Sequence, residues 1–180
     1  MLFRSSISIT DTVALNCATG VRVSGLPQSG GTFGLEILKS AMRNCGTGFE
    51  VTLAAGTVTS ATGVTIQSTD NLLQQCTTGL SLSGLPSSAT VLWASLGERI
   101  LDCVNGVSVI GSWNGGVALD SDIIGGPGGT GVVLNTSLPV HVRSTTIAGL
   151  PVGMNVTAVS PASQMHNNVF GSNILNVGGP

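Results

Sequence analysis

Apolar and polar residues alternate in short segments along the whole chain. One kind of segment follows a glycine and reads "GVRVSGL" at 20, "GFEVTLA" at 48, "GLSLSGL" at 79, "GVSVIGS" at 106, "GVVLNTS" at 131 and "GMNVTAV" at 153. The other kind reads "ISITDTVA" at 7, "LEILKSAM" at 35, "VTIQST" at 64, "VLWASL" at 91, "VALDSDII" at 117, "VHVRSTTI" at 140 and "SQMHNNVF" at 163. A period of two is typical of a β-strand with one buried face. The pattern therefore predicts short strands throughout.

The two kinds of segment recur in a fixed order, so the chain is built from a repeat. The spacing of the opening glycines gives a coil of about 22 to 31 residues, repeated roughly six or seven times, with two or three strands per coil. Strand-and-turn repeats of this length indicate a solenoid in which each coil pairs with the next through parallel strands. At about 4.8 Å per coil, such a rod is roughly 30 Å long. We expect one all-β domain over residues 1–180.

The alternation also predicts which side chains are buried. Trp93 falls in an inward slot, and two further inward columns contain Val21, Val23, Phe49, Val51, Leu80, Leu82, Val107 and Val109. The outward column between them contains Arg22, Glu50, Ser81, Ser108, Val133 and Asn155. The glycines at the head of each segment are expected to adopt a backbone conformation that other residues resist.

Four cysteines, at 17, 45, 76 and 103, each stand three residues before an opening glycine. Side chains in register on parallel strands point the same way, so we expect a column of free, buried thiols in preference to disulfides. A free-thiol column suits a protein assembled in a reducing cytoplasm. No CxxC pair occurs, and no metal site or cofactor is predicted.

Composition narrows the classes of partner. Only 8% of residues are charged, the net charge is −2 and no basic cluster occurs, which argues against nucleic acid as a partner. No apolar run reaches the roughly 18 residues of a spanning helix, so membrane insertion is not expected. The N-terminal residues do not resemble a signal peptide.

The phrases "NCATGVRV" and "QCTTGLSL" resemble the recurring "xNCxxGVxV" phrase of the right-handed parallel β-helix, or pectin-lyase-like, superfamily. The resemblance extends over residues 7–177 and implies a right-handed parallel β-helix. The chain is most like the β-helix of a viral tailspike or tail fibre. The phrase is a packing motif that lyases, hydrolases, tailspikes and adhesins share, so it specifies the fold and not the activity.

That resemblance implies a structural or receptor-binding part of a virion appendage that recognises cell-surface glycans without catalysis. It implies a homo-oligomer, most simply a homotrimer, or assembly with other virion subunits, and a location in the virion; an extracellular location is the alternative. A polysaccharide lyase or glycoside hydrolase is a second hypothesis, although the "NTD…DD…GHG" series of pectin-active members is absent. A self-assembling filament is a third. Neither end shows a polar or helical cap, so we expect either a longer parent chain or other subunits at the ends.

Candidate site residues lie near the ends of the second kind of segment. If the strand stays extended through "ALDSDII", Asp120 and Asp122 both face outward, with Cα atoms about 7 Å apart, which is compatible with acid and base roles. In the next two coils the positions equivalent to Asp120 and Asp122 hold Arg143 and Thr145, then His166 and Asn168. This favours the alternative that all these polar side chains only form a solvent-exposed corner of the solenoid. Asp120, Arg143 and His166 form one column that could bind a sugar acid or act only as a surface ion ladder. Trp113 is a candidate sugar-stacking side chain.

Overall fold

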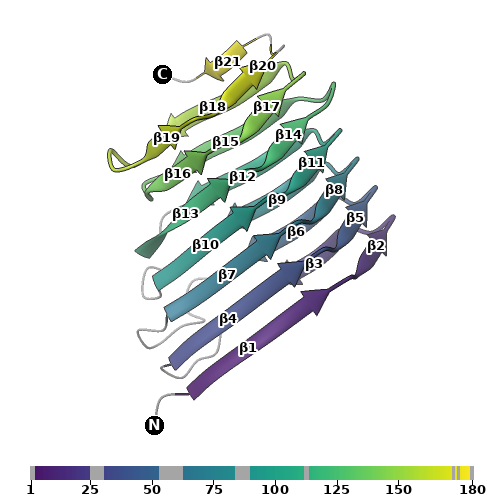
Figure 1. The fold of residues 1–180 in the computed structure, drawn as a ribbon, viewed down its shortest axis with the longest axis vertical. Coiled ribbons are helices and arrows are strands. Elements are labelled where there is room, and N and C mark those ends of the chain that lie inside the picture. The colour runs from purple at the N-terminus through teal and green to yellow at the C-terminus, as the bar shows by residue number, and fades with distance from the viewer. Residues whose placement is uncertain are drawn as a thin grey trace.

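The chain forms a parallel β-solenoid with three sheets, seen here in a computed structural model that describes residues 3–24, 31–52, 63–83, 90–111, 114–171, 173 and 175–178. Each sheet has seven strands, and successive strands of a sheet come from successive coils. The coils stack from the N-terminal β1 to the C-terminal β21 (Figure 1). Five strands of each sheet lie between two neighbours, and all pairs are parallel. The prediction of an all-β parallel solenoid is confirmed.

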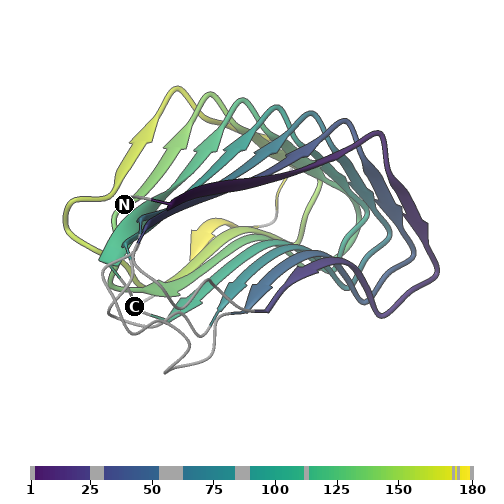
Figure 2. The same cartoon turned by 90° about the horizontal axis from the view of Figure 1, so that it is seen from below.

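The coils share one cross-section, which we describe by its sheets. Sheet A contains β1 (Phe3–Thr10), β4 (Gly31–Leu38), β7 (Gly63–Thr69), β10 (Thr90–Leu96), β13 (Asn114–Asp120), β16 (Val140–Arg143) and β19 (Gln164–His166). Sheet B contains the short strands β2 (Val13–Leu15), β5 (Ala41–Arg43), β8 (Leu72–Gln74), β11 (Arg99–Leu101), β14 (Ile123–Gly125), β17 (Thr146–Ala148) and β20 (Val169–Gly171). Sheet C contains β3 (Thr19–Val23), β6 (Thr47–Thr52), β9 (Thr78–Ser83), β12 (Asn105–Gly111), β15 (Thr130–Thr136), β18 (Val152–Ala158) and β21 (Leu175–Gly178). Seen along the stack, sheets A and C form the two long sides and sheet B joins them at one end (Figure 2).

The core fills the space between the sheets as the alternation predicts. On sheet C, Phe49 and Val51 pair in register with Leu80 and Leu82 of the next coil, and all four are buried. The outward column is also in register, since Glu50 pairs with Arg22 on one side and Ser81 on the other. From sheet A, Trp93 points into the core and meets the Phe49 ring edge-on, with ring centroids 6.3 Å apart. These contacts confirm the predicted inward and outward columns.

Sharp corners between the sheets are made by residues in the left-handed region. At the corner from sheet A to sheet B the residues have φ between 48° and 69°; they are Asp11, Lys39, Asp70, Gly97, Ser121, Ser144 and Asn167. Short polar residues and glycine tolerate this region better than other residues do. The N–H groups of the first six corner residues donate to a carbonyl of the next coil, as Ser121 does to the Arg143 carbonyl at 2.9 Å. The chain direction changes at these positions, which decides where the following side chain points.

The glycines that open the sheet C segments correct one expectation. Gly79 and its counterparts at 20, 48, 106 and 131 have no left-handed φ, so conformational freedom is not the reason for them. A Cβ at Gly79 would lie 2.6 Å from the Gly106 carbonyl oxygen and 2.5 Å from Cγ2 of Ile100. Glycine is required because adjacent coils approach too closely here for any side chain.

Candidate functional site

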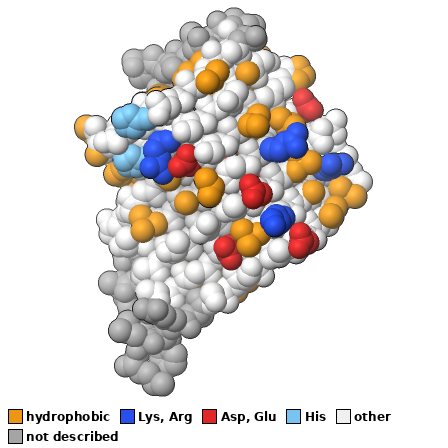
Figure 3. Space-filling view, viewed as in Figure 1, with side chains coloured by type: hydrophobic (Ala, Val, Ile, Leu, Met, Phe, Trp, Pro, Cys, Tyr) orange, Lys and Arg blue, Asp and Glu red, His pale blue; other side chains and the backbone are white. Residues whose placement is uncertain are grey.

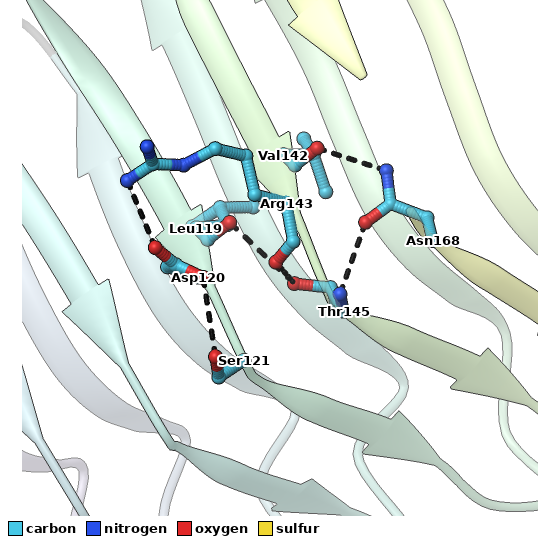
Figure 4. Close-up of polar contacts among 7 residues, drawn as sticks. All are labelled: Leu119, Asp120, Ser121, Val142, Arg143, Thr145 and Asn168. Carbon is cyan, nitrogen blue, oxygen red and sulfur yellow. Dashed lines mark hydrogen bonds and ion pairs between the residues drawn. The ribbon is translucent and has the colours of Figure 1, made fainter. Parts of the chain in front are cut away.

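The outer face of sheet A carries a charged column near the C-terminal ends of its strands. Asp120 of β13 is in register with Arg143 of β16, which is in register with His166 of β19. The Arg143 guanidinium lies 2.8 Å from a carboxylate oxygen of Asp120, and both side chains are partly exposed. Ser121 donates a hydrogen bond of 3.1 Å to the other Asp120 oxygen (Figure 4). The register predicted for this column is confirmed, and the structure adds an ion pair between its first two members.

Histidines extend the polar surface beside this ion pair. His141 precedes Arg143 by two residues on β16, so both side chains project from the same face of the strand. His166 is exposed, and its Nε2 lies 3.3 Å from the amide oxygen of Gln164. In the space-filling view the histidine side chains gather beside basic and acidic side chains on this face (Figure 3).

An apolar hollow of about 330 Å³ adjoins the charged column. Its lining includes Leu92, Gly116, Ala118, Pro139 and His141. Gly116 stands beside Leu92 in register, and Ala118 lies between Ala94 and His141, so small residues leave room next to a large exposed one. Gly116, Ala118 and Asp120 alternate along β13 and therefore share its outer face. The hollow and the ion pair thus form one continuous surface.

Asp122 does not belong to that surface, which corrects the predicted carboxylate pair. Ser121 has φ 58°, so the strand does not stay extended and Asp122 points into the core with none of its surface exposed. Its oxygens accept hydrogen bonds from the Ser95 hydroxyl at 2.8 Å and the Glu98 N–H at 2.9 Å. Burial raises the pKa of Asp122 to about 6. Asp120 and Asp122 face opposite sides of the sheet, so they do not flank one bound sugar.

The idea of a solvated corner is correct for only half of its residues. Arg143 and His166 are exposed, whereas Thr145 is fully buried and Asn168 is half-buried. Asn168 accepts a hydrogen bond from the Thr145 N–H at 3.0 Å and donates one of 2.9 Å to the Val142 carbonyl (Figure 4). The second slot of this corner is therefore part of the core.

A buried polar ladder runs through that core slot. It consists of the buried Ser40, Asn71, Glu98, Asp122 and Thr145 and the half-buried Asn168, one from each successive coil. Glu98 is fully buried, and its Oε1 accepts hydrogen bonds from the Ser68 hydroxyl at 2.8 Å and the Asn71 amide at 2.9 Å. Burial raises the pKa of Glu98 to about 7, and the nearby Asp122 adds to this effect. The sequence did contain a signal for the ladder, because every coil has a polar residue directly after the left-handed corner residue.

The remaining candidates add no site to the described surface. Trp113 lies outside the described residues. In the described part of the chain, no cluster of three or more His, Cys, Asp and Glu residues is arranged to hold a metal ion. The same ranges include no helix with the length and hydrophobicity needed to span a bilayer.

The fold and this face define the chain as a parallel β-solenoid with one candidate binding surface, formed by the hollow and the Asp120–Arg143–His166 column on sheet A. Comparison with known proteins found no matching family model, no matching curated protein and no matching solved structure. The assignment of a function therefore depends on the chemistry of this surface.

Proposed function

We propose that this chain is a glycan-recognising, non-catalytic part of a virion appendage, a right-handed β-helix whose candidate binding surface lies on sheet A. The observation that carries the proposal is the apolar hollow of about 330 Å³, whose lining residues Ala118 and His141 are followed two positions later on the same strands by the Asp120–Arg143 ion pair. Ligand sites combine a mostly apolar concave surface with a few polar groups that fix orientation. A sugar offers the matching chemistry, since its C–H groups pack on apolar atoms and its hydroxyls bond charged side chains.

Leu92 and Arg143 have distinct roles in this proposal. Leu92 is 52% exposed and supplies apolar area at the hollow, where a sugar ring can pack. Arg143 offers several N–H donors in a fixed geometry, and hydrogen bonds from a charged donor are stronger than those between neutral groups. Asp120 holds the guanidinium in place and offers an acceptor to ligand hydroxyls.

Binding without cleavage is favoured over the lyase or hydrolase hypothesis. Glycoside hydrolysis needs two carboxyl groups on either side of one bond, roughly 5 to 10 Å apart. Asp122 is buried and bonded to Ser95 and Glu98, so Asp120 lacks the partner carboxylate that the sequence pattern offered. The proposal keeps the assembly in a reducing cytoplasm that the free thiols favour, and the homotrimer or complex with other virion subunits that the family resemblance implies.

An array of neutral and acidic oligosaccharides, including chains with uronic and sialic acids, tests the binding. We expect retention of at least one glycan class and at least about tenfold weaker binding by Leu92→Asp and by Arg143→Ala. Arg22→Ala is a matched control, because Arg22 forms a comparable partly exposed ion pair with Glu50 on sheet C, at 2.7 Å. Equal losses in Arg143→Ala and Arg22→Ala, no retained glycan, or release of reducing ends or unsaturated sugars would each overturn the proposal.

Light scattering tests the assembly. We expect a mass of about three times the 18.0 kDa of one chain. A monomer at all concentrations contradicts the homotrimer, and rods whose length rises with concentration favour the filament hypothesis.

A further inference from the structure

Four thiols stack at the corner between sheets B and C. The backbone there is paired from coil to coil, since the carbonyl of Cys17 accepts the Gly46 N–H at 3.0 Å and that of Cys45 accepts the Thr77 N–H at 3.1 Å. All four cysteines are free, which confirms the predicted thiol column. Cys45, Cys76 and Cys103 are buried, whereas Cys17 is only half-buried. Cys17 is thus the member of the column that a solute reaches first.

Cys17 and Cys45 are already in direct contact. Their Sγ atoms lie 2.9 Å apart, although 28 positions separate them in the sequence. Residues paired across parallel strands are about 4.8 Å apart, which falls within the Cα separation of a disulfide. Formation of an S–S bond of about 2.05 Å requires the two sulfurs to approach by roughly 0.9 Å. The geometry supplies an accessible thiol with a second thiol immediately behind it.

We propose that Cys17 and Cys45 form a redox modification site, at which a small-molecule disulfide such as oxidised glutathione links the first described coil to the second. The Cys17 thiolate attacks one sulfur of glutathione disulfide, whose S–S bond breaks as one glutathione thiolate leaves. Cys45 then loses its proton and attacks the Cys17 sulfur, which releases the second glutathione. Two protein thiols are oxidised to one disulfide, and one glutathione disulfide is reduced to two thiols.

The order of attack follows from the surroundings of the two thiols. Burial raises the pKa of the Cys45 thiol to about 11, so Cys45 reacts poorly with a free oxidant in solution. Once Cys17 carries glutathione, the Cys45 sulfur is adjacent to the bond that must be attacked. Cys76 and Cys103 are each about 2% exposed, and a glutathione molecule does not reach them in the folded chain.

The bond would stabilise a coil that, in the described residues, is paired on one side only. Strands β1, β2 and β3 each pair with only one other strand in the described residues, whereas inner strands pair with two. End units of a solenoid open more readily than inner units. A cross-link closes the segment from Cys17 to Cys45, which contains β3, β4 and β5, and reduces the conformational freedom of the unfolded chain. The inference does not depend on the proposed function.

The experiment uses the full native chain, incubated with oxidised glutathione and then alkylated with iodoacetamide under denaturing conditions, so that every remaining free thiol reacts. We expect the intact mass to show two alkylated thiols instead of four, and the peptide map to contain a Cys17–Cys45 cross-link. Dithiothreitol should reverse both changes. Amides of β3 should exchange at least about tenfold more slowly in the oxidised chain. Cys17→Ser should abolish the cross-link, and Cys103→Ser, a matched control in the same column, should leave it intact.

Several results overturn the inference, and the peptide map of the wild-type chain decides even if a variant does not fold. The inference is contradicted if all four thiols remain free, or if a glutathione adduct at Cys17 forms but is not converted to the Cys17–Cys45 disulfide. A cross-link that involves Cys76 or Cys103 also contradicts it. A cross-link that forms equally well in Cys17→Ser also contradicts it.

Discussion

Replacement of Glu98 by Gln should make the solenoid more stable at neutral and alkaline pH. Glu98 is fully buried, and its Oε1 is held by Ser68 and Asn71, whereas its Oε2 has no hydrogen-bond partner among the described residues. A buried carboxylate without a cation nearby is costly, and burial raises the pKa of Glu98 to about 7. Gln keeps the acceptor that Ser68 and Asn71 use and removes the ionisation.

The magnitude follows from the pKa difference between the folded and unfolded chains. The ordinary pKa of Glu98 is 4.5 and the folded value is about 7; at 1.36 kcal/mol per unit, this corresponds to about 3 kcal/mol. Because the folded pKa is raised, the favourable contribution of protonated Glu98 to the free energy of unfolding is fully present below pH 4.5. It is lost as the pH rises through about 7, and above that pH the folded chain contains the buried carboxylate. We therefore expect Glu98→Gln to match the wild type near pH 4.5 and to exceed it by about 3 kcal/mol at pH 8.

Urea unfolding followed by far-UV circular dichroism at pH 4.5 and at pH 8 measures this difference. Glu36→Gln is the matched control, since Glu36 is on the outer face of sheet A and partly exposed. Its unfolding free energy should follow that of the wild type at both pH values. The reasoning is refuted if Glu98→Gln is less stable than the wild type at pH 8, or if the difference between them does not change with pH.

Further predictions concern packing and surface charge. Gly79→Ala should destabilise by about 1 to 3 kcal/mol or more in urea, because its Cβ would lie 2.6 Å from a carbonyl oxygen; Gly34→Ala, whose nearest neighbour would be at 3.8 Å, should be nearly neutral. Trp93→Ala should cost about 3 to 5 kcal/mol in the same assay, since the side chain is 2% exposed. Arg143→Ala should change stability by less than about 1 kcal/mol, because its ion pair is solvent-exposed, and added salt should reduce even this difference in thermal denaturation. A larger loss of stability for the Arg143 or Gly34 variant contradicts the exposed or open environment described for that residue. A smaller loss for the Gly79 or Trp93 variant contradicts the tight packing described there.

The repeat made the fold predictable, because stacked coils bury equivalent positions and each coil therefore repeats the same alternation of apolar and polar residues. Inward residues such as Val51 and Leu82 alternate with outward ones such as Glu50 and Ser81, and the structure pairs them in the expected register. The ion-pair column was also accessible from the alignment of coils. The apolar hollow was not, because it results from small residues on adjacent strands and requires knowledge of which outer positions lie side by side.

The orientation of Asp122 could not be predicted from a period of two. The alternation places Asp120 and Asp122 on the same face only if the residue between them is extended, and Ser occurs in strands as well as in corners. With φ 58°, Ser121 makes the corner and reverses the expected orientation. If Ser121 is assumed to be extended, the buried Asp122 is wrongly placed on the outer surface beside Asp120, where it resembles a catalytic carboxylate.

The buried ladder explains why a polar residue follows each left-handed corner residue. At a corner some backbone N–H groups lose their sheet partner, and a buried N–H needs an acceptor. The side chain of the next coil supplies it, since Ser40 accepts from the Thr12 N–H at 3.1 Å, Asn71 from the Ser40 N–H at 2.7 Å and Asp122 from the Glu98 N–H at 2.9 Å. A hydroxyl or amide performs this role without charge. Where the ladder uses Glu98 and Asp122 instead, the same position makes the stability of the fold depend on pH, because burial in the corner raises the pKa of both carboxyls.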